Sequence, residues 1–319
     1  MIMVLGSNQE NIVTHVYRSL LSREIEALMI EQSDIPNTVR IIMEAKGKEL
    51  KGYFLQQDSK KILFEDITSI YARPGVGYFE VYEQYEQKEI DFVNSECLIA
   101  LTWLLEYGNF LVLNRPSASR SNASKPNQIS LIQQFGLQVP RTLITNDQQA
   151  IKEFYENHNG EVIYKSISSV RSIVRKMTEE DLNRLDTLRY SPIQIQECID
   201  GIDIRVHVVG QEYFASEICS EESDYRYDRT TSMKRFDLPD EVAEACFKTA
   251  DGLNLPLAGI DLRMTPEGAF YCFEANPSPV YIYYERKTNF GVSSPEPITD
   301  ALCSLLKQGI RQEKTAQTL

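Results

Sequence analysis

Two short apolar runs around a Pro/Gly turn constrain the fold of this chain more than any other stretch. Residues 257–263 and 269–277 are both rich in apolar side chains, and Pro266 and Gly268 lie between them. Proline presets the backbone dihedral at the start of a turn and glycine relieves its exit, so the pattern predicts a β-hairpin. A hairpin fixes which residues of its two strands face one another.

Two carboxylates fall on one face of this predicted hairpin. With Pro266 as the first central turn residue, Asp261 would oppose Cys272, and the two-residue period of a strand puts Asp261, Cys272 and Glu274 on the same face. Asp261 and Glu274 would then be diagonal neighbours, roughly 7–8 Å apart, with Asn276 at the strand end. Oxygen donors that converge in this way suit Mg²⁺, which completes its shell with water and phosphates. The alternative is a surface hairpin with solvated acids, but their apolar neighbours favour the metal.

The composition bounds the class of protein. A chain of 319 residues with 42% hydrophobic content can form two or three packed lobes, and a net charge of -13 argues against nucleic acid as the main partner. The six cysteines are scattered without a CxxC pair, as in reduced cytosolic proteins. The N-terminus lacks a charged region typical of signal peptides, and the longest apolar run, residues 97–105, is too short to span a bilayer. We therefore expect a cytoplasmic protein without a nucleic-acid or membrane partner.

The first 115 residues have the pattern of an α/β lobe with an inserted antiparallel meander. Apolar runs and helical periodicity predict these elements in order: a strand at 1–5, a helix at 11–21, a strand at 27–30, a meander over 39–64, a strand at 69–74, a helix at 88–105 and a strand at 110–116.

A lysine stands at the start of the next predicted helix, which ends at Phe135. Ser124 is a suitable N-cap and Pro126 fits the first turn. Lys125 is unfavourable there, because a helix N-terminus carries partial positive charge. A bound anion would relieve this conflict; the alternative is a solvated lysine that costs a few tenths of a kcal/mol.

Alternating strands follow this helix. The predicted elements are strands at 161–165, 192–199, 202–210 and 214–218, a helix at 241–253 and a closing helix at 298–310. Lys165 ends the first of these strands, and Asp203, Arg205 and His207 share one polar face of the third. Because no partner for His207 can be identified, we expect an exposed or satisfied sheet residue rather than a base.

The order of Asp261, then Glu274 and Asn276 two residues apart, resembles the metal site of the ATP-grasp superfamily of carboxylate ligases. Within this superfamily the chain is similar to glutathione synthetase, to the ligases that add glutamate to ribosomal proteins and to the graspetide ligases. The resemblance implies a mixed α/β ATP-grasp fold. Its parts would be an N-terminal α/β domain at 1–115, a central subdomain at 116–190, a C-terminal antiparallel subdomain at 191–312 and a polar tail at 313–319.

The resemblance also implies a role for individual residues. Asp261, Glu274 and Asn276 would bind metal. Nucleotide binding would involve Lys125 and Lys165 at the phosphates, Ser169 in the loop over them, the backbone of Glu197 and Ile199 at adenine, and Asp203. Arg205 and Arg226 would be catalytic, with Arg226 at the transferred phosphoryl group, since a guanidinium suits bidentate phosphate binding. The alternative for Arg226 is an ion pair with Asp224 in the same loop.

The implied function is an ATP-dependent ligase with ATP and two Mg²⁺ ions as cofactors. Asn114-Arg115-Pro116 and Asp224-Tyr225-Arg226 are similar to segments of the graspetide ligases, which crosslink side chains of a ribosomally made precursor peptide. The chain departs from that group at residues 278–281, which lack the usual glycine and tryptophan. One alternative is a ligase that joins a free amino acid or amine to a small carboxylate substrate or a peptide, and another is a nucleotide-binding regulator without turnover. A homodimer is compatible with all three.

Overall fold

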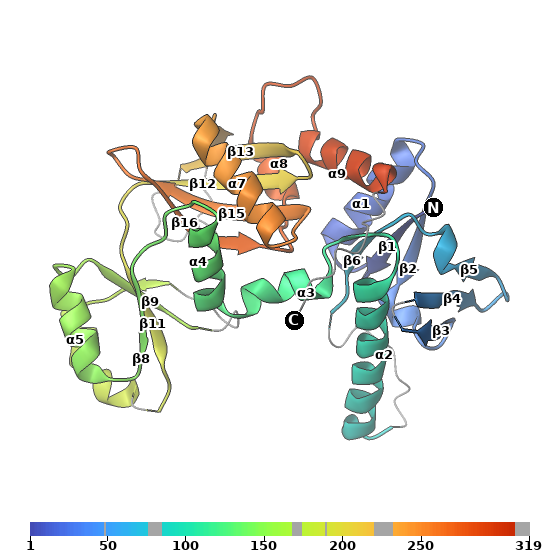
Figure 1. Cartoon of the computed structure of the whole chain (residues 1–319), viewed down its shortest axis with the longest axis horizontal. Helices are drawn as coiled ribbons and strands as arrows, with labels where there is room; N and C mark the ends of the chain where they lie inside the picture. The colour runs from blue at the N-terminus through green and yellow to red at the C-terminus, as the bar shows by residue number, and fades with distance from the viewer. Residues whose placement is uncertain (48, 76–84, 168–173, 189, 220–231, 310–319) are drawn as a thin grey trace. The chain divides into compact units, whose positions relative to one another are not determined.

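The chain folds into two compact units. The computed structural model describes residues 1–47, 49–75, 85–167, 174–188, 190–219 and 232–309 (Figure 1). The first unit comprises Met1–Ser117 and Glu296–Leu319, and the second comprises Ala118–Pro295. Parallel and antiparallel sheets with flanking helices confirm the predicted mixed α/β class. The finer division at residues 115, 190 and 312 stays a prediction.

A four-stranded parallel sheet in the order β2-β1-β6-β7 forms the core of the first unit. Its strands are β1 (Ile2–Gly6), β2 (Ala27–Glu31), β6 (Ser69–Arg73) and β7 (Leu111–Leu113). All five residues of β1 are buried, as expected for a strand of a parallel sheet covered on both faces. Helices α1 (Asn11–Ser22) and α2 (Gln87–Tyr107) follow β1 and precede β7, so the strand and helix predictions for this unit are confirmed.

The predicted meander is a separate three-stranded antiparallel sheet in the order β3-β4-β5. Its strands are β3 (Val39–Lys46), β4 (Glu49–Gln56) and β5 (Lys61–Leu63). Phe54 and Ile62 are buried in the same apolar cluster as residues of the parallel sheet, and this shared core joins the two sheets of the unit.

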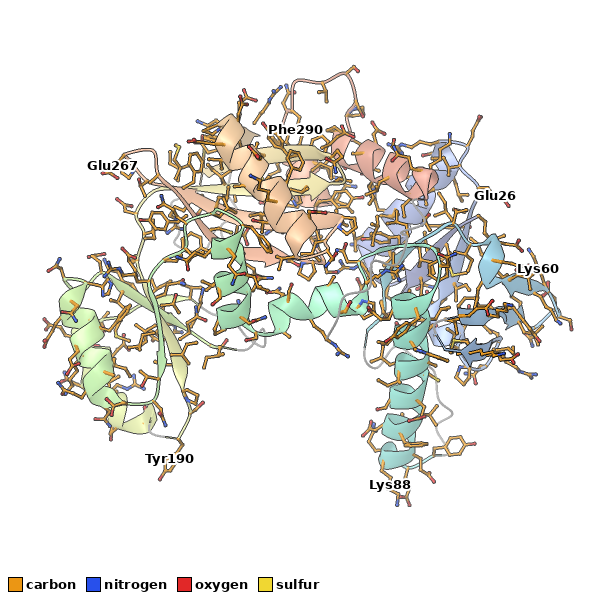
Figure 2. All side chains as sticks on the ribbon, in the orientation of Figure 1. Glu26, Lys60, Lys88, Tyr190, Glu267 and Phe290 are labelled. Carbon is orange, nitrogen blue, oxygen red and sulfur yellow. The ribbon has the colours of Figure 1, made fainter. Side chains whose placement is uncertain are left out.

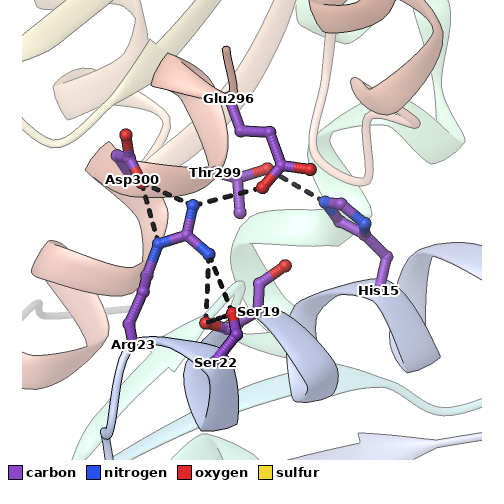
Figure 3. A network of polar contacts seen from close by, with 7 residues as sticks. All are labelled: His15, Ser19, Ser22, Arg23, Glu296, Thr299 and Asp300. Carbon is purple, nitrogen blue, oxygen red and sulfur yellow. Dashed lines mark hydrogen bonds and ion pairs between the residues drawn. The ribbon is translucent and has the colours of Figure 1, made fainter. Parts of the chain in front are cut away.

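Helix α9 (Pro297–Gln308) returns the chain to the first unit and packs on α1. Figure 3 shows the polar network between these helices, in which Arg23 donates to Asp300 Oδ1 from Nε over 2.8 Å and to Glu296 Oε2 from Nη2 over 3.2 Å. His15 Nε2 lies 3.0 Å from Thr299 Oγ1 in the same network. The second unit is thus inserted between two segments that pack together.

The second unit contains a four-stranded antiparallel sheet in the order β10-β9-β11-β8. Its strands are β8 (Thr142–Thr145), β9 (Val162–Lys165), β10 (Arg175–Lys176) and β11 (Ile193–Glu197). Helix α5 (Gln148–Asn157) is capped by Asp147, whose carboxylate accepts from the Ala150 N–H over 2.7 Å. Ile151 of α5 packs with Val162 and Ile195 of the sheet in a small buried core.

A five-stranded antiparallel sheet in the order β14-β13-β12-β15-β16 completes the second unit. Its strands are β12 (Ile202–Val209), β13 (Glu212–Cys219), β14 (Ser232–Arg235), β15 (Leu257–Met264) and β16 (Phe270–Asn276). Helices α4 (Lys125–Gln134) and α7 (Asp240–Gly252) contribute Ile132 and Cys246 to its buried face. The shorter helices of the chain are α3 (Pro116–Ser119), α6 (Glu179–Leu182) and α8 (Ile282–Lys287). Figure 2 shows Glu267 at the tip of the β15–β16 hairpin.

None of the helices that the structure describes is both long enough and apolar enough to cross a membrane.

Candidate functional site

The β15–β16 hairpin forms as predicted, but its register differs from the prediction. Asp261 pairs directly with Glu274, and Leu262 pairs with Cys272, because a bulge between these pairs adds Phe273 on β16. The predicted pairing of Asp261 with Cys272 is therefore wrong. Cys272 is instead fully buried on the core face of the sheet.

The new register brings the two acids closer than predicted. Residues directly opposite in an antiparallel pair have Cβ atoms about 4.5–5.5 Å apart, compared with about 7–8 Å for diagonal neighbours. Asn276 lies opposite Gly259 at the end of the same pair of strands. The side chains of Asp261 and Glu274 are 33% and 25% exposed, so both acids are half-buried and open to a ligand.

The Glu274 carboxylate is contacted by two residues from the segment before and at the start of α4. Asn122 Nδ2 donates to Glu274 Oε1 over 2.9 Å, and Lys125 Nζ lies 3.5 Å from Oε2. Asn122 Oδ1 is buried and has no hydrogen-bond partner among the residues that the structure describes. Sequence reasoning missed Asn122, because its contact with Glu274 spans 152 residues and leaves no local pattern.

Lys125 occupies the helix start that the sequence predicted, in an environment that excludes the solvated alternative. It is 9% exposed, and Pro126 lies in the first turn of α4. Ser124 occupies the N-cap position, but its side chain makes no capping hydrogen bond, contrary to our prediction. The Glu274 carboxylate lies beside Lys125 and supplies the negative charge that this position was expected to need.

A second buried lysine lies close to the same acids. Lys165 ends β9, is 7% exposed and donates from Nζ to Gln196 Oε1 over 3.1 Å. Burial, and to a smaller extent the charge of Lys125, lower the pKa of Lys165 to about 8, while Glu274 and Asp261 oppose the shift. Lys125, Glu274 and Asp261 therefore lie within electrostatic range of Lys165.

The Asp261 carboxylate is held by Arg205 from the neighbouring strand β12. Arg205 pairs with Asp261 in the sheet, and its Nη1 donates to Asp261 Oδ1 over 2.5 Å. The guanidinium crosses Gly259, where an added Cβ would lie 2.1 Å from Arg205 Nη2. A glycine inside an apolar strand often marks such a close approach, so Gly259 could have been found from the sequence.

His207 lies next to Arg205 and is buried, so it is not the exposed sheet residue that was one of our two expectations. Its side chain is fully buried, its ring centroid is 4.9 Å from that of Tyr284, and Arg205 Nε donates to its Nε2 over a long 3.5 Å. Nδ1 has no partner among the described residues. Burial, with a contribution from Arg205, lowers the pKa of His207 well below 6.5, so the ring is neutral.

The residues predicted to lie at adenine take part in a separate set of contacts. Asp203 accepts from Arg263 Nε over 2.7 Å and from Nη2 over 2.9 Å, and Arg263 Nη1 also donates to the Ile199 carbonyl over 2.8 Å. The Glu197 N–H donates to the Arg141 carbonyl over 3.0 Å. These contacts fix the segment that links β11 to β12. No local pattern indicates the ion pair between Asp203 and Arg263, which are 60 residues apart.

Ser169, Asp224 and Arg226 lie outside the described residues.

The donor set fits a magnesium–nucleotide complex. No cluster of three His, Cys, Asp or Glu side chains suitable for a metal occurs in the described part of the chain. Asp261, Glu274 and the amide of Asn276 instead form an oxygen set that leaves most of the metal shell to water and phosphate, which is the usual arrangement for Mg²⁺. Two buried lysines beside these acids supply positive charge for phosphate oxygens.

Comparison with known proteins places this arrangement in a family. Residues 122–294 match the RimK-like ATP-grasp domain. The α-aminoadipate–LysW ligase LysX of Sulfurisphaera tokodaii is 23% identical over 203 residues, which cover 60% of this chain and 71% of LysX.

Two solved structures share the fold over almost the whole chain. The macrocyclase MdnC of Microcystis aeruginosa MRC, bound with precursor peptide MdnA, superposes with a TM-score of 0.80 at 19% identity, covering 97% of this chain and 100% of MdnC. The ATP-grasp ligase PsnB, complexed with a minimal precursor, Mg and ADP, gives a TM-score of 0.76 at 26% identity, covering 96% of this chain and 98% of PsnB.

The match spans both sheets of the second unit and includes every described residue of the candidate site. The chain belongs to the RimK-like ATP-grasp family and is an ATP-grasp ligase.

Proposed function

We propose that this ligase crosslinks side chains of a ribosomally made precursor peptide through ester or amide bonds. The observation that carries the proposal is the convergence of Lys125 and Lys165 with Asp261 and Glu274 in one site. Such a site can neutralise phosphate charge and hold a divalent ion beside it. The likeness of the whole chain to PsnB and MdnC, which were solved with precursor peptides, supports a peptide as the substrate.

Within this proposal, the residues of the candidate site divide into metal ligands and nucleotide contacts. Asp261, Glu274 and Asn276 hold Mg²⁺, with two ions expected, and Mg²⁺ neutralises phosphate charge when it is bound. Lys125 and Lys165 bind phosphate oxygens, and the backbone of Glu197 and Ile199 faces adenine, next to Asp203.

The remaining residues act near the reacting carboxylate. Arg205 lies beside Asp261 and stabilises negative charge on the acyl phosphate, together with Arg226. Ser169 belongs to the loop over the phosphates.

The Ile199 backbone supports the proposed adenine contact. Among the described residues no protein group accepts a hydrogen bond from the Ile199 N–H, so this N–H is available for adenine.

The reaction needs positioning and charge neutralisation more than a protein nucleophile. A substrate carboxylate oxygen attacks the γ-phosphorus of ATP, and ADP leaves. A hydroxyl or amine of the same peptide then attacks the acyl carbon, releases phosphate and loses its proton. One crosslink therefore removes one water from the peptide.

A second candidate is the addition of a free amino acid or amine to a peptide or small carboxylate. The similarity to LysX, an amino-acid ligase by its name, favours this candidate. Residues 278–281 lack the glycine and tryptophan usual in graspetide ligases, and this difference is also compatible with the second candidate.

Mass spectrometry of the peptide product distinguishes crosslinking from the addition of an amino acid. The protein is incubated with ATP, Mg²⁺ and short acidic peptides encoded beside its gene, with and without free amino acids. The crosslinking proposal predicts ADP release and a peptide that has lost water; a peptide that has gained an amino acid would contradict it. The predicted homodimer stays a prediction that sedimentation can test.

A further inference from the structure

Strand β16 is the edge of its five-stranded sheet, and helix α4 closes that edge. An edge strand leaves backbone N–H and C=O groups without partners, which is costly when the edge is buried. At Ala275 both groups are satisfied by one side chain. The Ala275 N–H donates to Gln128 Oε1 over 3.1 Å, and Gln128 Nε2 donates to the Ala275 carbonyl over 2.8 Å.

The Gln128 amide takes the place of a neighbouring strand. A carboxamide presents one acceptor and one donor in a plane, as a peptide group does. Gln128 is 1% exposed and Ala275 is fully buried, so water does not compete for these two bonds. A second bond along the same edge runs from the Cys272 N–H to the Gln138 carbonyl over 2.7 Å, and the bulge at Phe273 lies between the two anchors.

Ala275 stands between two residues of the candidate metal site, Glu274 and Asn276. Lys125 and Gln128 are three residues apart in α4, a spacing that places them on the same face of a helix. One turn of α4 therefore contacts the Glu274 carboxylate through Lys125 and holds the next backbone unit through Gln128. Both side chains are buried, so this turn has little freedom to move.

We infer that Gln128 is a positioning residue, which fixes the register and spacing of Glu274 and Asn276 so that both reach the same metal ion. This inference rests on the proposed metal-binding role of these two residues. Gln128 touches neither the ion nor the nucleotide and acts through the backbone of Ala275.

Removal of the amide should weaken metal binding more than it weakens nucleotide binding. Leucine at position 128 fills a similar volume but leaves two buried backbone groups without partners. Loss of a residue that orients metal ligands typically lowers metal affinity about 10- to 100-fold. The nucleotide contacts of Lys165 come from another sheet and are not altered directly.

The test compares the full-length wild type, Gln128→Leu and the matched control Gln133→Leu, which changes an exposed glutamine on the same helix. The thermal shift caused by ADP is measured without Mg²⁺ and across a Mg²⁺ titration. We expect Gln128→Leu to raise the Mg²⁺ concentration for half of the metal-dependent shift about tenfold or more. The shift by ADP alone should be unchanged, and the control should match the wild type throughout.

Hydrogen exchange supplies a measurement that needs neither metal nor turnover. The backbone amide of Ala275 should be protected in the unliganded wild type and should exchange faster in Gln128→Leu. An unprotected Ala275 amide in the wild type would overturn the inference. If Gln128→Leu does not fold, Gln128→Glu replaces it, because the carboxylate keeps the acceptor and loses the donor; a smaller rise in the required Mg²⁺ is expected.

The outcomes separate the inference from the function on which it rests. A wild-type Mg²⁺ response in a folded Gln128 variant overturns the positioning role alone. Absence of any metal-dependent shift in the wild type overturns the proposed metal site itself.

Discussion

Arg205 donates from Nη1 to Oδ1 of Asp261 over 2.5 Å, across the pairing of β12 with β15. The side chain of Arg205 is 6% exposed, whereas that of Asp261 is 33% exposed. Asp261 is therefore accessible in the site, while its partner Arg205 on the neighbouring strand is buried. A guanidinium so placed limits repulsion between Asp261 and the opposing Glu274 before a metal binds.

This arrangement predicts a specific effect of Gly259→Ala. The new Cβ would lie 2.1 Å from Arg205 Nη2, so the guanidinium must move away from Asp261. We expect ATP turnover to fall roughly 10-fold or more, because small displacements of positioned groups cost about that much. Circular dichroism should show a folded protein, since the flexible end of a side chain gives way.

A double-mutant cycle identifies the cause. If the substitution acts through Arg205, then Gly259→Ala should have no further effect on turnover in an Arg205→Ala background. Additive losses in the double variant would show that Gly259 matters for another reason.

The proposed metal ligand Glu274 gives a second prediction. Glu274→Ala should abolish Mg²⁺-dependent ATP turnover and the Mg²⁺-dependent part of ADP binding, measured by calorimetry, while the fold remains intact. Glu267→Ala is the matched control, because this acid lies at the exposed tip of the same hairpin (Figure 2). Equal activity of Glu274→Ala and the control would exclude a metal-binding role for Glu274.

The lowered pKa of Lys165 predicts pH dependence. Its value of about 8 is below the ordinary 10.5, chiefly because burial disfavours the charged form and secondarily because Lys125 repels it. Between these values the unfolded chain binds more protons, so the contribution of Lys165 to stability rises with pH across that window. In the folded chain its positive charge is lost as the pH rises through about 8.

ADP binding should therefore weaken as the pH rises through about 8, by up to about tenfold between pH 7 and pH 9. Lys165→Arg should retain its charge over this range and flatten the profile. Calorimetric titrations of both proteins at several pH values measure this difference. The same slope in both would show that Lys165 is not the titrating group.

Arg115 has a structural role that its place in the Asn-Arg-Pro segment does not reveal. It belongs to the Asn-Arg-Pro segment that resembles other ligases, yet its guanidinium donates to backbone carbonyls at the end of α2, over 2.6 Å to Leu105, 2.9 Å to Glu106, 3.2 Å to Gly108 and 2.8 Å to Phe110. These bonds satisfy carbonyls that a helix end leaves without partners.

Arg115→Ala should therefore lower stability and spare the site chemistry. We expect a loss of about 1–3 kcal/mol in the free energy of unfolding, because buried carbonyls lose their donors. Chemical denaturation measures this loss, with Arg18→Ala on the exposed face of α1 as the control. Unchanged stability, or loss of ADP binding in a protein that remains folded, would contradict the capping role.

Elements with a clear period could be predicted, and contacts between distant segments could not. The strand at β1 and the helix at α2 followed from apolar patterning, and so did the face of β15 that carries Asp261. The bulge at Phe273 shifted the register by an amount that no local pattern encodes. Contacts of Asn122 with Glu274 and of Gln128 with Ala275 depend on the packing of α4 against an edge strand, which arises only in three dimensions.

A crystal structure of the full chain with ADP and Mn²⁺ in place of Mg²⁺ tests the account most directly, because anomalous scattering locates the metal. The account predicts a metal peak coordinated by Asp261, Glu274 and Asn276, with Lys125 and Lys165 at the phosphate oxygens. Nucleotide bound without a metal at these oxygens, or bound elsewhere in the chain, would contradict it.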